Sequence, residues 1–196
     1  MSLLILGLGN IGDQYKGTRH NLGFEVVEKV QQALKVPFQP TTDFYDWAKR
    51  KLDDRRLILA WPKTYMNRCG IAARSLLDAH GLTPDRMLVV VDDFNLPLGS
   101  IRIRQGGSDG GHNGLASLIE VLQTESFPRL RLGIGPVPDN RDAVDFVLSR
   151  FEPDEVEQVK KMVDTAAEAV LFTLDHSLEE AMAKYNAKSP AQPEVT

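Results

Sequence analysis

Short apolar runs alternate with amphipathic helical patterns along this chain, and the alternation constrains the fold more than any other feature of the sequence. Strand-like runs occupy residues 3–6, 44–51, 56–61, 87–91, 101–104 and 130–132. Helical spacing of apolar residues occupies residues 21–34, 71–80, 115–122, 152–174 and 178–185. Strands separated by helices favour a largely parallel or mixed sheet covered by helices. We therefore predict an α/β fold, a single domain with a central twisted mixed sheet flanked by helices on both faces.

The length suits one hydrophobic core. A chain of 196 residues can bury most of its unfolded surface without disulfides or metals. We assign residues 1–186 to the α/β domain. Residues 187–196 are rich in proline and small or polar residues, and we expect them to be a disordered tail.

Composition excludes several classes of protein. The single cysteine, Cys69, allows no internal disulfide and no cysteine-based zinc site, and it fits a reducing cytoplasm. No apolar run approaches the roughly 18 residues that cross a membrane, and the first residues lack the basic region of a secretion signal. We expect a cytoplasmic protein with no membrane partner.

The overall charge is misleading unless its distribution is considered. A formal net charge of −4 argues at first against a nucleic-acid partner. Residues 1–138, however, hold 17 basic and 14 acidic side chains, whereas residues 139–196 hold 6 basic and 13 acidic ones. The acidic excess therefore belongs to the last third, where solvated helix faces would account for it. The first two thirds remain compatible with a nucleic-acid partner.

A glycine-rich turn at residues 7–12 follows the first strand and matches the G-x-G-x-x-G pattern of dinucleotide sites. Such a loop should open directly into a helix, but residues 13–20 precede the helical pattern. No strand ending in Asp or Glu lies about 20 residues onward, where a ribose would be bound. We interpret the segment as a tight turn that needs glycine and expect no nucleotide cofactor.

Polar side chains gather where predicted strands end and helices begin. They are Asn10, His20, Asn21, Tyr65, Asn67, Asp92, His112 and Asn113. Because ligands of α/β sheets bind beyond the carboxyl ends of the strands, we expect these side chains to share one pocket. A histidine can deprotonate water, a carboxylate can hold its tautomer, and amides can hold a carbonyl. The set lacks metal-binding spacing, so it favours metal-independent hydrolysis of an ester or amide. The residues alone leave open that His20 merely caps a helix and Asp92 a loop.

Five blocks of the sequence resemble the bacterial peptidyl-tRNA hydrolase family, in the family's order and over about residues 3–186. The blocks are residues 7–24, 62–70, 92–99, 110–114 and 127–135. The sequence departs from the family pattern at a few positions. Ile11 stands where the family usually has proline, Val91 where it has histidine, and Asn95 where it has an acidic residue. Arg68 and Cys69 stand where it commonly has Leu-Ser. None of them removes a proposed catalytic group.

The resemblance implies hydrolysis of the ester that joins a peptide to the terminal ribose of tRNA, which recycles tRNA from prematurely released translation products. It implies that His20 acts as the base on water, that Asp92 stabilises its working form, and that Asn10 senses the acylated amino group. It implies no metal and no cofactor, and we expect a monomer. The implied substrate-binding residues are Tyr15, Tyr65, Met66, Asn67, Gly110, His112 and Asn113.

The resemblance also suggests a function for the arginines of two predicted strands. Arg102 and Arg104 alternate along one strand, as do Arg129 and Arg131 along another, so each pair shares one strand face. By resemblance, Arg104 and Arg131 best match the pair that binds tRNA phosphate. We also expect Arg19 and Lys16 to extend this patch toward the pocket. From the residues alone, ion-paired surface arginines remain an alternative.

Two other functions remain open on the sequence. A non-catalytic RNA-binding protein could share the fold, but His20, Asp92 and Asn10 are all intact. A nicotinamide-dependent oxidoreductase would need the glycine-rich turn to bind a dinucleotide, and its context argues against that. Glycine and prolines at residues 135–138 suggest flexibility in residues 136–147, and the sequence leaves open whether such a segment covers the cleft.

Overall fold

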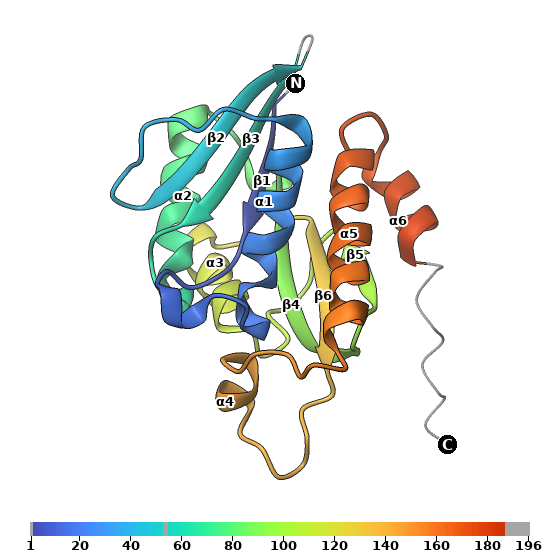
Figure 1. Cartoon of the computed structure of the whole chain (residues 1–196). Coiled ribbons are helices and arrows are strands. Elements are labelled where there is room, and N and C mark those ends of the chain that lie inside the picture. Colours follow the sequence, from blue (N-terminus) through green and yellow to red (C-terminus); the bar gives the residue numbers. More distant parts are fainter. Residues whose placement is uncertain (1, 53–54, 187–196) are drawn as a thin grey trace.

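A six-stranded mixed sheet forms the centre of the protein, in the order β2-β3-β1-β4-β6-β5 (Figure 1). The computed structural model describes residues 2–52 and 55–186. The strands are β1 (Ser2–Gly7), β2 (Tyr45–Leu52), β3 (Arg55–Pro62), β4 (Met87–Pro97), β5 (Ile101–Arg104) and β6 (Arg129–Gly135). Strands β3, β1, β4 and β6 run parallel, and the edge strands β2 and β5 pair antiparallel with their neighbours. The predicted mixed sheet is confirmed.

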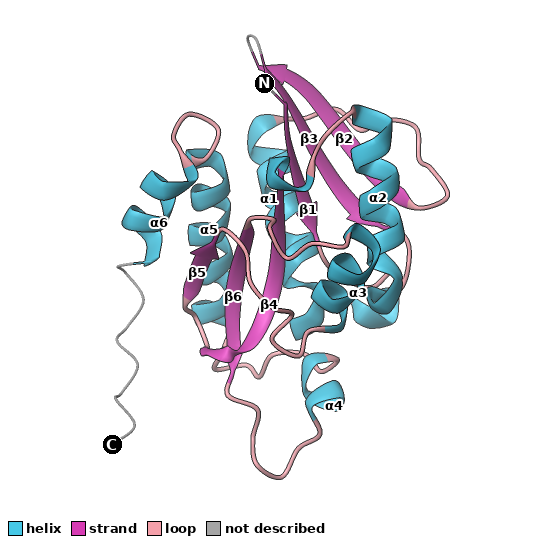
Figure 2. Ribbon diagram, turned by 180° about the vertical axis from the view of Figure 1, so that it is seen from behind, coloured by secondary structure: helices cyan, strands magenta, loops and turns pink. Residues whose placement is uncertain are grey.

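Helices cover both faces of the sheet. One layer contains α1 (Leu22–Leu34), α5 (Val156–Phe172) and α6 (Leu178–Asn186), seen in front in Figure 1. The other contains α2 (Cys69–His80) and α3 (Asn113–Leu122), seen in front in Figure 2. A short helix, α4 (Ala143–Val147), lies below the sheet in both views. Among the helices described, none is long and apolar enough to cross a membrane.

The strands divide their apolar side chains between two cores, as the period of two in a strand requires. In β1, Ile5 packs against the α1 and α5 layer, whereas Leu4 and Leu6 pack against the α2 and α3 layer. In β4, Val90 and Val89 alternate in the same way. Burial on both faces explains why these strands appear in the sequence as continuous apolar runs.

Strands β5 and β6 differ because only one of their faces is apolar. Ile103 and Leu132 contribute to the core beneath α5 and α6. The opposite face carries arginines, with Arg102 paired in register with Arg131 and Arg104 with Arg129. Figure 2 shows no described helix over β5 and β6 on this side. This face of β5 and β6 is therefore the place where basic side chains can meet solvent.

Gly23 allows helix α1 to lie close to the backbone of the sheet. A Cβ atom on Gly23 would lie 2.4 Å from the carbonyl oxygens of Leu8 and Val90. A side chain there would push α1 away from β1 and β4. Because the turn that contains His20 directly precedes this helix, the close approach also places His20 beside β4.

One local expectation is wrong. Strand β4 does not end at Val91 but continues to Pro97, with an irregularity in its pairing after Asp93, so Asp92 lies within the strand. Residues 136–147 include the helix α4, whose first turn is capped by Asp142. The tail predicted at residues 187–196 lies outside the described residues.

Candidate active site

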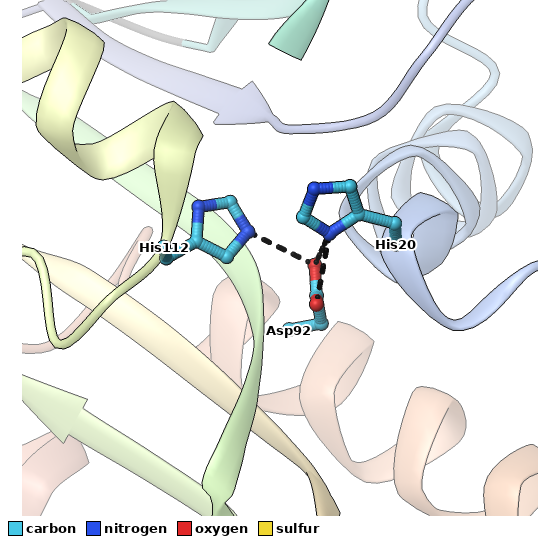
Figure 3. A group of neighbouring side chains, drawn as sticks. All are labelled: His20, Asp92 and His112. Atoms are coloured by element: carbon cyan, nitrogen blue, oxygen red, sulfur yellow. Dashed lines mark hydrogen bonds and ion pairs between the residues drawn. The ribbon is translucent and has the colours of Figure 1, made fainter. Parts of the chain in front are cut away.

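The buried carboxylate of Asp92 lies between two imidazole rings (Figure 3). Nδ1 of His20 lies 3.0 Å from Oδ2 and 3.1 Å from Oδ1 of Asp92. Nε2 of His112 lies 3.1 Å from Oδ1. The two rings are themselves close, with centroids 4.7 Å apart. The structure thus brings together the predicted His20 and Asp92 and adds His112 to the same hydrogen-bonded group.

The start of α3 determines the tautomer of His112. Its Nδ1 accepts hydrogen bonds from the backbone N–H groups of Gly114 at 3.0 Å and Leu115 at 3.3 Å. An Nδ1 that accepts carries no proton, so the proton of the neutral ring is on Nε2 and is donated to Asp92. His112 is therefore a helix cap that also holds the carboxylate, rather than a residue facing only the substrate.

His20 presents its second nitrogen away from the carboxylate. The ring comes from the short 3-10 turn η2 (Arg19–Asn21), just before α1. When Nδ1–H donates to Asp92, Nε2 is left as a lone-pair acceptor, and Figure 3 shows this nitrogen turned away from Asp92. A histidine held in this way can take a proton from water.

The charge state of Asp92 follows from its neighbours. Burial acts to raise the pKa of the carboxyl group, but attraction to His20 and His112 and their hydrogen bonds outweigh it. The pKa of Asp92 is held well below its usual value. The carboxylate is therefore ionised throughout the physiological range and can stabilise an imidazolium at His20.

Asn10 is fixed by contacts from two other segments. Its backbone N–H donates to Oδ1 of Asn21 at 2.8 Å, and Nδ2 of Asn21 donates to its carbonyl at 2.9 Å. The backbone N–H of Met66 donates to Oδ1 of Asn10 at 3.0 Å. Because a backbone N–H must meet an oxygen, the amide NH₂ of Asn10 remains to donate to a ligand. The sequence did not single out Asn21 for this role, although it is adjacent to His20.

The remaining predicted substrate-binding residues lie in or beside the turns that precede η2, α2 and α3. Met66 is buried in the turn η3 (Met66–Arg68), and a Cβ on Gly114 would come within 2.6 Å of its sulfur. Asn67 and Asn113, the neighbours of this contact, are both exposed. Tyr65 is 59% exposed. Tyr15 is half-buried in the turn η1 (Asp13–Tyr15), and Gly110, with a φ of 59°, lies in the turn before His112.

The basic residues have different environments. Arg104 is exposed at the end of β5, and Arg131 is partly exposed and forms an ion pair with Asp93. Arg129, predicted on a wet strand face, is buried. Its guanidinium donates to the carbonyls of Ser108 at 2.8 Å and Glu125 at 3.1 Å. Arg129 therefore holds the loop that leads to His112, because its side chain points beneath that loop rather than into solvent.

The expectation that Arg19 extends a basic patch is wrong. Arg19 is 2% exposed, pairs with Glu155, and lies between the rings of Phe146 and Phe151. Its guanidinium also donates to the carbonyl of Arg150. The Arg19 side chain therefore stabilises the segment between α4 and α5 and does not face solvent. Lys16 is exposed and pairs with Asp13 at 2.6 Å.

His20, Asp92 and His112 are also the described residues close enough together to suggest a metal site. Their hydrogen bonds argue for a different use. Nε2 of His112 must carry a proton, because Nδ1 accepts from two backbone N–H groups, and a protonated nitrogen cannot be a metal ligand. The donor set fits a hydrogen-bonded relay better than a cation.

Two other features lie apart from this chemistry. Cys69 is buried, its thiol lies 3.2 Å from the carbonyl oxygen of Gly114, and burial raises its pKa to about 12, so it is not a nucleophile. A wide groove lies at the other end of the sheet, between the start of β1 and the turn before α6. No predicted site residue lines this groove.

The fold and the site define a class of protein: a hydrolase built on an α/β fold. Its histidine–carboxylate pair can activate water, and amides nearby can hold a carbonyl. The chain belongs to the peptidyl-tRNA hydrolase family. The family model described as "Peptidyl-tRNA hydrolase" matches residues 4–193. The resemblance of the five sequence blocks is thus confirmed.

Individual members of the family align with this chain over nearly its whole length. The peptidyl-tRNA hydrolase of Synechocystis sp. is 43% identical over 184 residues, covering 93% of this chain and 95% of the relative. That of Aquifex aeolicus is 41% identical over 181 residues, covering 91% and 93%. A crystal structure of a peptidyl-tRNA hydrolase in complex with N-propanol has a TM-score of 0.89 at 29% identity and covers 96% of each chain. The predicted fold class is confirmed.

Proposed function

We propose that this protein hydrolyses the ester bond of peptidyl-tRNA, releasing free tRNA and peptide. The observation that carries the proposal is the Asp92–His20 pair, 3.0 Å apart, in a chain of the peptidyl-tRNA hydrolase family. Its substrates are N-blocked aminoacyl-tRNAs released from translation, and their hydrolysis recycles the tRNA. We further propose that it acts as a monomer in the cytoplasm.

The reaction begins at Nε2 of His20, which takes a proton from a water molecule. The resulting hydroxide attacks the ester carbonyl, and the oxyanion that develops is held by amide donors of Asn67, Asn113 and the backbone near Gly110. Asp92 stabilises the imidazolium for as long as the proton is there. Collapse of the intermediate breaks the bond to the ribose oxygen, which receives the proton from His20. No metal is needed, because the ester is already activated.

The substrate is bound at both ends. The amide NH₂ of Asn10 meets the acylated amino group, and Met66 supports it through the backbone N–H that fixes the Asn10 side chain. Tyr15 and Tyr65 pack against the unpaired end of the tRNA, where aromatic stacking is common. Arg104 and Arg131 contact backbone phosphates. Arg104 lies directly across from Arg129 and diagonally from Arg131, a separation of about 7–8 Å along the strand pair.

Turnover of N-acetyl-aminoacyl-tRNA tests the proposal. The wild-type protein should release the acetylated amino acid in the presence of a chelator, and His20→Ala should lose nearly all activity. His176→Ala is the matched control, because His176 is exposed on the turn before α6, far from Asp92, and should keep full activity. Binding of tRNA without turnover by the wild type would instead identify a non-catalytic RNA-binding protein.

A further inference from the structure

Asp93 follows Asp92 in β4, and its carboxylate pairs with Arg131, one of the two arginines proposed to bind tRNA phosphate. Oδ2 of Asp93 forms an ion pair with Nη2 of Arg131. The Asp93 side chain is 6% exposed, whereas that of Arg131 is 25% exposed. The Arg131 side chain therefore remains partly open to solvent, whereas its partner Asp93 is buried.

The Asp93 carboxylate is held in place rather than free to swing away. Its Oδ1 accepts the backbone N–H of Asn95 at 2.8 Å. The side chain of Asn95 in turn donates to the carbonyl of Gly110 at 3.1 Å. This hydrogen bond holds the Asp93 carboxylate in position beside Arg131.

The ion pair is next to the catalytic group. Asp92, His112, Asp93 and Arg131 line the same small pocket. A phosphate that contacts Arg131 lies close to Asp93, and the two anions share one guanidinium. A carboxylate and a phosphate bind guanidinium through the same donors, so each weakens the other.

We propose that Asp93 is a built-in competitor for tRNA phosphate at Arg131, which keeps the affinity for the product tRNA low. The inference rests on the proposed function, because it assigns the phosphate at Arg131 to peptidyl-tRNA. Asp93 is a positioning residue in this scheme and does not touch the reacting ester. An enzyme that cleaves one bond and then releases a whole tRNA benefits from such a limit on phosphate affinity.

Deacylated tRNA is the probe for the first measurement. Fluorescence anisotropy with the full chain at several KCl concentrations should give a Kd about five-fold lower for Asp93→Asn than for the wild type. This factor is expected for removing one charge a few ångströms from the contact in water. The salt dependence should steepen by up to about one phosphate contact. Asparagine keeps the oxygen that accepts from Asn95, so the strand should remain folded.

Two further variants separate this idea from general charge effects. Asp85→Asn removes a like charge at the opposite end of β4, where Asp85 pairs with Arg86, and should leave the Kd unchanged. In an Arg131→Ala background, Asp93→Asn should produce no gain in affinity for tRNA, because the guanidinium for which Asp93 and the phosphate compete is absent. Unchanged or weaker binding by Asp93→Asn overturns the proposal, as does a gain that persists without Arg131.

The proposed function is judged separately by turnover of N-acetyl-aminoacyl-tRNA in the same wild-type preparation. If the wild type hydrolyses it and Asp93→Asn binds no more tightly, only the role of Asp93 fails. If the wild type neither hydrolyses it nor binds tRNA, the proposed function fails and the inference about Asp93 with it.

Discussion

Nε2 of His112 lies 3.1 Å from the same Asp92 carboxylate that pairs with His20. Through its other nitrogen, His112 caps the first turn of α3. The carboxylate that orients the proposed base is thus tied to a helix as well as to its own strand. This arrangement makes the geometry of His20 dependent on the start of α3.

Removing the His112 ring should affect both stability and rate. His112→Ala loses the cap and leaves Asp92 with one partner fewer, so we expect the free energy of unfolding to fall by about 1–2 kcal/mol. We also expect kcat to fall about ten-fold or more while the affinity for deacylated tRNA stays the same. Urea unfolding and turnover measure the two effects. A stability loss with unchanged kcat would mean that His112 only caps α3.

Asp92→Asn should reduce kcat by about 10²–10⁴-fold, because a neutral amide cannot stabilise the imidazolium and can favour the wrong tautomer of His20. Binding of deacylated tRNA should change little, since the carboxylate lies below the reacting group. Single-turnover rates and anisotropy test the two statements. Loss of tRNA binding in parallel with kcat would contradict this role.

The pH dependence of stability has a definite sign at Asp92. Its pKa in the folded state lies below the unfolded value, so the unfolded state takes up the proton first. The stabilisation is present above pH of about 4 and is lost as pH falls toward the folded pKa. The stabilisation that wild type has over Asp92→Asn should therefore be lost as pH falls below about 4. A difference that does not shrink as pH falls below about 4 would contradict this role of Asp92.

Arg19→Ala should destabilise the protein without weakening tRNA binding. It leaves Glu155 without its buried partner and empties the space between Phe146 and Phe151, which should cost about 3 kcal/mol or more. Lys16→Ala is the control, because its pair with Asp13 is exposed to solvent and should contribute little to stability. Denaturant unfolding gives both values, and Arg19→Lys gives a milder variant if the alanine variant does not fold. A loss of tRNA affinity in a folded Arg19 variant would show that Arg19 contributes to tRNA binding after all.

Cys69 should be inert in the native protein. With a thiol pKa raised to about 12, the reactive thiolate is almost absent at pH 8, and burial also blocks the reagent. Iodoacetamide should label the protein only after denaturation, and Cys69→Ala should retain its activity. Rapid labelling of the folded protein, or loss of turnover in Cys69→Ala, would contradict the assignment.

The sequence by itself determined the larger part of the fold and of the proposed catalytic group. Runs such as those in β1 and β4 are buried on both faces, so their composition alone indicates strands in a covered sheet. His20 and Asp92 are 72 residues apart, but both fall at positions where an α/β topology directs polar side chains to one edge. The family's five blocks then added the substrate class, which composition and spacing could not supply.

Only the tertiary structure decided which polar side chains were already engaged. Arg19, Arg129 and Arg131 are the same residue type in basic segments, yet one fastens α4 to α5, one holds the loop before His112, and one pairs with Asp93. Likewise, the tautomer of His112 follows from two backbone N–H groups at the start of α3. Strand periodicity assigns a side chain to a face, but its partner comes from a segment distant in sequence. Burial and hydrogen bonding with that partner, which depend on the assembled fold, determine whether a charge meets solvent or stays inside the protein.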